Sequence, residues 1–133
     1  MDVVIDTSAV IAVIVWAPER PAMIRYTADA GLVAPASLHW EVGNAFSAMF
    51  RRRRITLDQA REAVESYQQM LLRFVDIDLG QSLELSERLG LYAYDAYMVA
   101  CALNLRAPLL TLDKRLAEAA SRIGVRILEV NNT

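Results

Sequence analysis

Short runs of consecutive apolar residues alternate along the chain with longer stretches in which apolar residues recur every three or four positions. The short runs are rich in Val, Ile and Leu, which is typical of strands buried on both faces of a sheet. One run, residues 74–79, alternates apolar with acidic residues and is therefore predicted to lie near a sheet edge. The predicted strands are residues 3–5, 32–34, 74–79, 109–112 and 125–130.

The stretches between these strands have the periodicity of amphipathic helices. Thr7 or Ser8 can cap a helix that begins at Ala9, and Ser37 can cap a long helix that ends at four consecutive arginines. Further helices are predicted at residues 22–30, 80–89, 94–105 and 114–123. Residues 56–59 have the pattern of a capping box, and the helix that they open is predicted to bury the following side chains: Ala60, Val64, Tyr67 and Leu71.

Strands that alternate with helices predict an α/β fold with a central parallel sheet and helices on both of its faces. The 133 residues suffice for one domain, predicted to span residues 1–133, and no linker or repeat divides them. Hydrophobic residues make up 55% of the chain and charged residues 23%, as in a folded globular protein.

Several common catalytic systems are excluded by what the chain lacks. Its five glycines are scattered, so it has neither a phosphate-binding loop nor a dinucleotide fingerprint. With His39 as its one histidine, it cannot build a two-histidine nuclease site, and with Cys101 as its one cysteine it cannot build a cysteine-based zinc site. We interpret both residues as structural. Any catalysis therefore depends on carboxylates, and so on a hard metal ion.

Four acidic residues interrupt apolar surroundings at positions that lead to one edge of the predicted sheet. Asp6 and Asp113 each follow a strand, and Glu41 and Asp95 each lie in the first turn of a helix. In a parallel α/β sheet the strand ends and the helix starts that follow them face the same edge, where ligands bind. The four acids are therefore expected to converge.

Each acid also has an interpretation without function. An acid in the first helical turn is favoured by the helix dipole alone, and an Asp after a strand is often a helix cap. The four together favour a site, because caps need not all come from elements that open onto one edge. Clustered carboxylates repel one another unless a divalent cation is bound, and such an ion can activate water for phosphodiester hydrolysis.

The segments around these acids resemble a known family. They are residues 4–9, 41–45, 94–96 and 110–113, and they are similar to the PIN-domain ribonucleases, especially the small VapC-type toxins of toxin–antitoxin pairs. The resemblance extends over nearly the whole chain. It implies a PIN fold with a central, mostly parallel five-stranded sheet between helices, and a Mg²⁺- or Mn²⁺-dependent endoribonuclease that acts as a toxin.

The resemblance also implies roles for individual residues. The metal-binding catalytic acids would be Asp6, Glu41, Asp95 and Asp113. The supporting polar residues would be Thr7, Ser8, Asn44 and Thr111. A hydrogen bond from Asn44 to Glu41 is reasonable, because the two are three residues apart on one helical face, and Thr111 lies on the same side of its strand as Asp113.

Partners follow from the resemblance as well. VapC-type toxins are neutralised by a small VapB-like antitoxin that covers the active site, and they form homodimers. The net charge of −2 is unusual for a nucleic-acid-binding protein, but one basic patch could contact RNA phosphates or could be only a solvated helix end: Arg51, Arg52, Arg53 and Arg54. The first helix has no polar residue between Ala9 and Trp16, so it is buried all round or covered by a partner.

Two other functions use the same features. A PIN-like module could bind RNA or protein without cutting it, and an aspartyl phosphatase or receiver domain would also place an Asp after a strand. Phosphatases require a second acid two residues later, where this chain has Ser8. No segment has the length of a membrane span, and the amino-terminal residues lack the basic charge of a signal peptide, so a cytoplasmic protein is expected.

Overall fold

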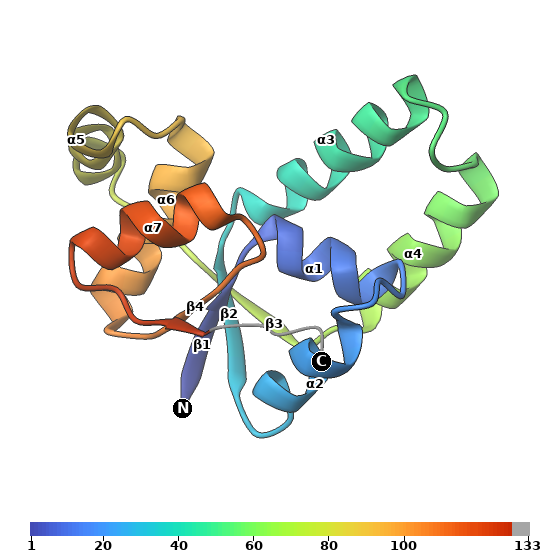
Figure 1. Ribbon diagram of the computed structural model, residues 1–133, viewed down its shortest axis with the longest axis horizontal. Coiled ribbons are helices and arrows are strands. Elements are labelled where there is room, and N and C mark those ends of the chain that lie inside the picture. The colour runs from blue at the N-terminus through green and yellow to red at the C-terminus, as the bar shows by residue number, and fades with distance from the viewer. Residues whose placement is uncertain (129–133) are drawn as a thin grey trace.

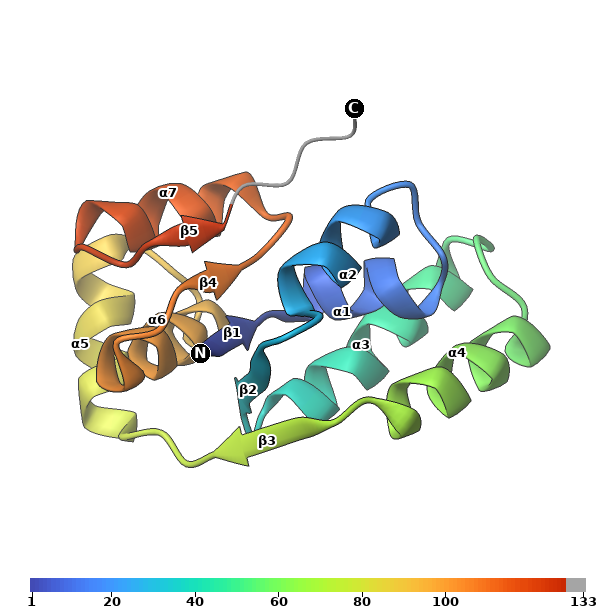
Figure 2. The same ribbon diagram turned by 90° about the horizontal axis from the view of Figure 1, so that it is seen from below.

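The computed structural model describes residues 1–128 of the chain, and these residues form a three-layer α/β fold (Figures 1 and 2). Its strands are β1 (Asp2–Ile5), β2 (Gly31–Pro35), β3 (Leu72–Val75), β4 (Leu109–Leu110) and β5 (Ile127–Leu128). Its helices are α1 (Thr7–Ile14), α2 (Arg20–Thr27), α3 (Leu38–Arg51), α4 (Leu57–Gln69), α5 (Leu79–Leu89), α6 (Ala93–Leu105) and α7 (Lys114–Arg122).

The five strands form one sheet in the order β3-β2-β1-β4-β5, and every pairing between them is parallel. Helices α1 to α4 cover one face of the sheet and α5 to α7 cover the other (Figure 2). The predicted α/β class, with its five-stranded parallel sheet between helices, is thus confirmed. The chain moves outward from β1 to β2 and β3 and then crosses back to β4, so the strand order reverses between β1 and β4.

The core lies on both sides of β1, as its continuous apolar run predicts. Val3, Val4 and Ile5 are completely buried, and so are Leu109 and Leu110 of the neighbouring β4. Val4 pairs with Leu109 and Ile5 with Leu110 in the sheet. Because this pairing places the ends of β1 and β4 side by side, it also brings together the residues that follow each strand.

Some element boundaries differ from the prediction for local reasons. The helix α1 begins at Thr7 rather than Ala9, because Asp6 is its N-cap. The strand β3 ends at Val75 because the side chain of Asp78 accepts a hydrogen bond from the Gln81 amide and starts α5 there. The predicted strand at residues 109–112 is shortened to two residues, and residues 129–130 of the last predicted strand lie outside the described part of the chain.

Leu71 was predicted to be buried, and this prediction is wrong. The helix α4 ends at Gln69, and Met70 has the extended backbone that leads into β3. Leu71 therefore falls outside the helical periodicity, and its side chain is 92% exposed.

The apolar sequence of α1 left open whether the helix is buried within the domain or covered by a partner, and the structure buries most of it within the domain. It packs against α2, α3 and α4 within the domain. Ala9, Val10, Ala12 and Ile14 are buried. Ile11 and Val13 are half-buried, and Trp16, two residues beyond the helix, is 72% exposed.

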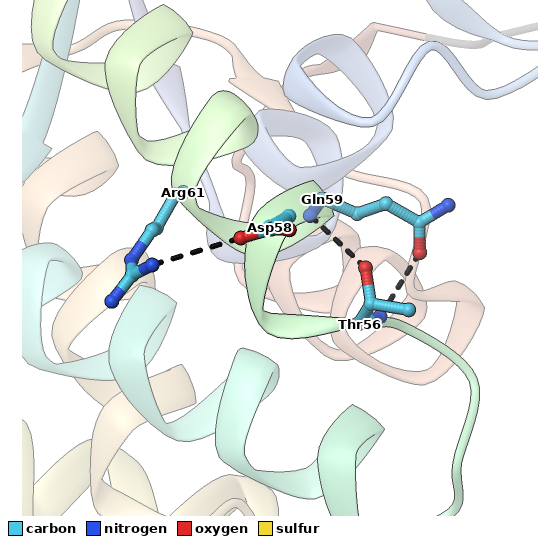
Figure 3. A network of polar contacts seen from close by, with 4 residues as sticks. All are labelled: Thr56, Asp58, Gln59 and Arg61. Atoms are coloured by element: carbon cyan, nitrogen blue, oxygen red, sulfur yellow. Dashed lines mark hydrogen bonds and ion pairs between the residues drawn. The ribbon is translucent and has the colours of Figure 1, made fainter.

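Helices α3 and α4 form a hairpin that extends away from the sheet (Figure 1). The start of α4 has the predicted capping box (Figure 3): Thr56 Oγ1 accepts a hydrogen bond from the Gln59 amide at 3.1 Å, and Gln59 Oε1 accepts one from the Thr56 amide at 2.9 Å. An exposed ion pair between Asp58 and Arg61, at 3.6 Å, lies on the next turn. Among residues 1–128, no helix is both long and apolar enough to span a bilayer.

Candidate functional site

The four predicted acids all lie at the carboxyl edge of the sheet. Asp6 follows β1 and Asp113 follows the short connection after β4, while Glu41 and Asp95 lie in the first turns of α3 and α6. In Figure 1, α1, α3, α6 and α7 all begin above the upper ends of the strands. This edge contains the point between β1 and β4 where the strand order reverses, which is the usual ligand position in open α/β sheets.

Asp6 is the most buried of the four acids, with 5% of its surface exposed. Its Oδ1 accepts a hydrogen bond from the Ser8 hydroxyl at 2.7 Å and one from the Ala9 amide at 3.0 Å. Its Oδ2 accepts a short hydrogen bond from the Thr111 hydroxyl. Both carboxylate oxygens are therefore held in place, and Asp6 is a helix cap as well as a candidate ligand.

Ser8 and Thr111 also join the ends of β1 and β4 to each other. The Ser8 hydroxyl oxygen accepts a hydrogen bond from the Leu112 amide at 2.9 Å. The Thr111 hydroxyl oxygen accepts one from the Asp113 amide at 3.0 Å. The two hydroxyls thus orient Asp6 and fix the backbone that carries Asp113.

Glu41 is held by two hydroxyl groups. Its Oε1 accepts a hydrogen bond from Thr7 at 3.2 Å, and its Oε2 accepts one from Ser37 at 3.1 Å. Ser37 precedes α3 as predicted, but its hydroxyl makes no capping bond to the helix backbone and contacts Glu41 instead. Its spacing of four residues before Glu41 was the available signal for this contact.

Asn44 does not have the predicted contact with Glu41. Its side chain is exposed, and the Glu41 carboxylate receives its hydrogen bonds from Thr7 and Ser37. Thr7 and Ser37 approach Glu41 from the end of β1 and from the residue before α3. These positions place their hydroxyls closer to the carboxylate than Asn44, which lies one turn further along the helix.

The four carboxylates are close enough for their charges to interact. Burial raises the pKa of Asp6, and the charge of Asp113 raises it further against the hydrogen bonds from Thr111, Ala9 and Ser8. Burial raises the pKa of Asp95, and the charge of Asp113 adds to this effect.

Glu41 completes this set of interactions. Burial raises its pKa to about 7, and the charges of Asp95 and Asp6 contribute in the same direction, while its two hydroxyl partners lower it. The charge of Asp113 thus acts on Asp6 and Asp95, and their charges act on Glu41, so repulsive interactions connect the four acids in a ring.

Little positive charge compensates this ring. In the part of the chain that the structure describes, none of the four acids forms an ion pair with a lysine or arginine. Arg115, in the first turn of α7, lowers the pKa of Asp95 by its charge, and its guanidinium donates a hydrogen bond to the Gly90 carbonyl at 3.3 Å. Arg115 was not among the predicted site residues, although it lies two residues after Asp113.

The donor set fits a hard divalent cation. Carboxylate oxygens are the ligands that Mg²⁺ and Mn²⁺ prefer. A cation would relieve the repulsion among the four acids and offset the burial of Asp6, Glu41 and Asp95, while Asp113 is exposed. Among residues 1–128, no three acidic, histidine or cysteine side chains already meet around one point. Asp6, Glu41, Asp95 and Asp113 would therefore hold such an ion partly through water, which Mg²⁺ retains readily.

The other candidate residues lie as follows. Arg51, Arg52, Arg53 and Arg54 are all exposed where α3 ends, at the tip of the hairpin. At 1.5 Å per residue, Arg51 lies about 15 Å along the helix from Glu41. His39 contacts Trp40 and Tyr67 through its ring, and Cys101 is buried with its pKa raised by burial to about 11, so both have structural surroundings.

Comparison with known proteins agrees with this fold. Residues 3–122 match the family model described as PIN domain. Similar structures include PAE2754 from Pyrobaculum aerophilum, with a TM-score of 0.72 and 19% sequence identity over 96% of this chain and 83% of that one. VapBC2 from Rickettsia felis, crystallised with a DNA fragment from its promoter, has a TM-score of 0.69 and 14% identity over 98% of this chain and 100% of its own.

A third similar structure is VapC20 from Mycobacterium tuberculosis, a toxin that cleaves the sarcin–ricin loop. Its TM-score is 0.63 at 15% identity, over 89% of this chain and 95% of that one. These identities are low, so the structural likenesses establish the fold only. No curated protein sequence matches the chain.

Proposed function

Because the chain belongs to the PIN domain family, we propose that it is a metal-dependent endoribonuclease of the VapC toxin type. The observation that carries this proposal is the ring of four mutually repelling carboxylates at the carboxyl edge of the sheet. Such a ring is destabilising unless it binds a cation. Many nucleases and phosphatases use bound metal ions to hydrolyse phosphate esters.

In this mechanism Asp6, Glu41, Asp95 and Asp113 would hold Mg²⁺ or Mn²⁺. A bound ion would supply a water of lowered pKa and positive charge opposite the phosphate. Ser8 and Thr111 hold both oxygens of Asp6, and Thr7 and Ser37 hold both oxygens of Glu41. These hydroxyls keep the carboxylates oriented, which limits the reorganisation required during the reaction.

The proposal includes a protein partner. The similar structure of VapBC2 is bound to a fragment of promoter DNA, and by analogy we assign this chain a small VapB-like antitoxin that covers the acids. A homodimeric state is part of the proposal because the resemblance to VapC-type toxins implies it. An open apolar groove of about 440 Å³ between α3 and α4 is compatible with a partner helix. The groove is lined by Phe46, Phe50, Leu57 and Val64, among others. The toxin would act on RNA in the cytoplasm.

The experiment that tests the proposal is RNA cleavage by the purified chain. We expect cleavage of total cellular RNA in Mg²⁺ or Mn²⁺ and none in EDTA, with activity restored when the metal is returned. Titration calorimetry with Mn²⁺ should detect binding. A folded chain that neither binds Mn²⁺ nor cleaves RNA would contradict the proposal and favour a non-catalytic binding module.

The metal-free protein is expected to lose stability as the pH rises from 5 to 7.5. The pKa of Glu41 is raised from 4.5 in the unfolded chain to about 7 in the folded one. Between these values the folded state retains a proton that the unfolded state has lost, so the free energy of unfolding falls with increasing pH. Asp6 and Asp95 act in the same direction.

Urea unfolding in EDTA at several pH values measures this effect. Glu41→Gln removes one of the titrating groups, so we expect a weaker pH dependence in that variant. Added Mn²⁺ should restore the stability of the parent protein at pH 7.5. A parent stability that is constant or rises over this range in EDTA would show that the acids are not destabilising.

The arginines at the hairpin tip are proposed to contact RNA phosphates. Each phosphate contact on a single strand releases counterions and adds about 0.7 to the slope of log affinity against log salt concentration. Replacing Arg52 and Arg53 with Gln should therefore reduce the slope by up to about 1.4. The slope is obtained from RNA binding at several salt concentrations, and an unchanged slope would identify the arginines as a solvated helix end.

A further inference from the structure

Trp40 is exposed directly beside the candidate site. It precedes Glu41 in the first turn of α3, and 67% of its surface is accessible. Its ring makes a T-shaped contact with the His39 ring, with a centroid distance of 5.0 Å and an interplanar angle of 86°. Most of a large apolar side chain thus remains in water next to the acids, which is costly unless something covers it.

Trp40 begins an exposed face of α3, one residue before Glu41. Residues three and four positions apart lie on one face, so Asn44 follows Trp40, Ser47 and Ala48 come next, and Arg51 ends the series. All four of these later residues are exposed. The helix therefore offers an open strip, here called the α3 strip, which comprises Trp40, Asn44, Ser47, Ala48 and Arg51.

The α3 strip has an aromatic side chain at the end of the helix that carries Glu41 and positive charge at its far end. Arg51 begins the run of four arginines and lies eleven positions after Trp40, which is about 16 Å along the helix. Stacked nucleotides rise about 3.4 Å each, so the strip matches about five nucleotides. The strip residues between Trp40 and Arg51 have small or short polar side chains, so no bulky side chain of the strip obstructs a strand that lies along it.

We propose that the α3 strip binds the RNA substrate as a single strand, with an unpaired base stacked on Trp40 and the backbone held by Arg51. This inference rests on the proposed ribonuclease function and assigns the residues that hold its substrate. Proteins that bind single strands combine aromatic stacking platforms with a basic surface that follows the backbone. Asn44 makes no hydrogen bond to Glu41 and lies between Trp40 and Arg51. Its side-chain amide can donate hydrogen bonds to the strand or accept them from it.

A protein partner fits the α3 strip less well. The core of a protein interface is a contiguous apolar surface, depleted in charge. Beyond Trp40 the strip has Asn44, Ser47 and Arg51, and its one apolar member, Ala48, is small. The apolar surface of this hairpin lies instead in the groove between α3 and α4.

The test measures RNA binding apart from cleavage. In the Asp6→Asn background and in EDTA, fluorescence anisotropy gives the affinity for a labelled oligouridylate of twelve nucleotides, one of three nucleotides, and a fully paired hairpin. We expect Trp40→Ala to weaken binding of the twelve-nucleotide strand by about 5- to 150-fold, as for the loss of one stacking platform, and Trp40→Phe to restore most of it. Arg51→Gln should weaken binding of the long strand and not of the short one.

The matched control is Trp16→Ala, which removes an indole of similar exposure, 72%, from the end of α1. We expect it to leave RNA binding unchanged. The inference is overturned if Trp40→Ala binds the single strand as tightly as its parent, or if the parent prefers the paired hairpin. It is also overturned, in favour of a protein interface, if Trp40→Ala changes the oligomeric mass and not the RNA affinity. Cleavage by the wild-type chain is scored separately, so the ribonuclease proposal can survive any of these outcomes.

Discussion

Asp6→Asn is expected to reduce RNA cleavage by at least about 100-fold while the protein remains folded. The loss of a group that merely supports a metal ligand costs about 10- to 100-fold, and Asp6 is proposed to be a ligand itself. It is also the most buried of the four acids, with both oxygens fixed by hydrogen bonds. The neutral amide retains the size of the side chain but lacks the charge that a cation requires.

Stability should not explain that loss. Asn is as good a helix cap as Asp, so the bond from the Ala9 amide can be kept, and the Thr111 hydroxyl can either donate or accept. Removing a buried charge whose pKa is raised by burial should leave the metal-free protein as stable as the parent at pH 7, or more stable. Initial cleavage rates and urea unfolding in EDTA measure the two effects.

The control for this prediction is Asp58→Asn. Asp58 likewise lies at the start of a helix, but it is exposed and forms an ion pair with Arg61 on the surface of α4 (Figure 3). We expect this variant to cleave RNA at the parent rate. If folded Asp6→Asn also cleaves at that rate, Asp6 is a helix cap and not a metal ligand.

Leu110→Ala is expected to have the largest effect on stability, with a loss of about 2–5 kcal/mol in the free energy of unfolding. Leu110 is completely buried in β4 and pairs with Ile5 of β1. Truncation removes buried apolar surface and leaves a cavity in a core that can collapse only partly. Because Thr111 follows directly and its hydroxyl holds Asp6, cleavage should fall as well.

Leu71→Ala makes the same chemical change at a side chain that is 92% exposed. We expect it to alter the free energy of unfolding by no more than about 0.5 kcal/mol. Urea unfolding of both variants compares the two positions directly. Equal losses would mean that Leu71 packs against something, as its place in the helical pattern first indicated.

Most of the fold is readable from local patterns. Buried parallel strands are continuous apolar runs, and amphipathic helices repeat every three or four residues, so the alternation of the two predicts the sheet and its helices. The same patterns predict that the four acids meet, because strand ends and helix starts share one edge of a parallel sheet. These are regularities of the backbone, and they need no knowledge of individual side chains.

Individual contacts required the tertiary structure. Ser37 has the residue type of a helix cap, yet its hydroxyl donates a hydrogen bond to Glu41. The Thr7 hydroxyl, from a segment far away in the sequence, donates to the other oxygen of the same carboxylate. Leu71 continues a helical pattern beyond the residue where the chain must turn into β3. Such outcomes depend on segments far apart in sequence and on where backbone geometry ends an element.

The burial of the acids belongs to the same category. A sequence pattern identifies Asp6 as an acid after a strand, but it does not distinguish a helix cap from a candidate ligand. In the structure the Asp6 side chain caps α1, accepts a hydrogen bond from Thr111 and experiences the charge of Asp113. Burial and neighbouring charge set the pKa of a carboxyl group, and both come from the packing of distant segments. The type and order of the elements were local information, whereas the electrostatic character of the site arises only when β1, β4 and the helix starts are assembled.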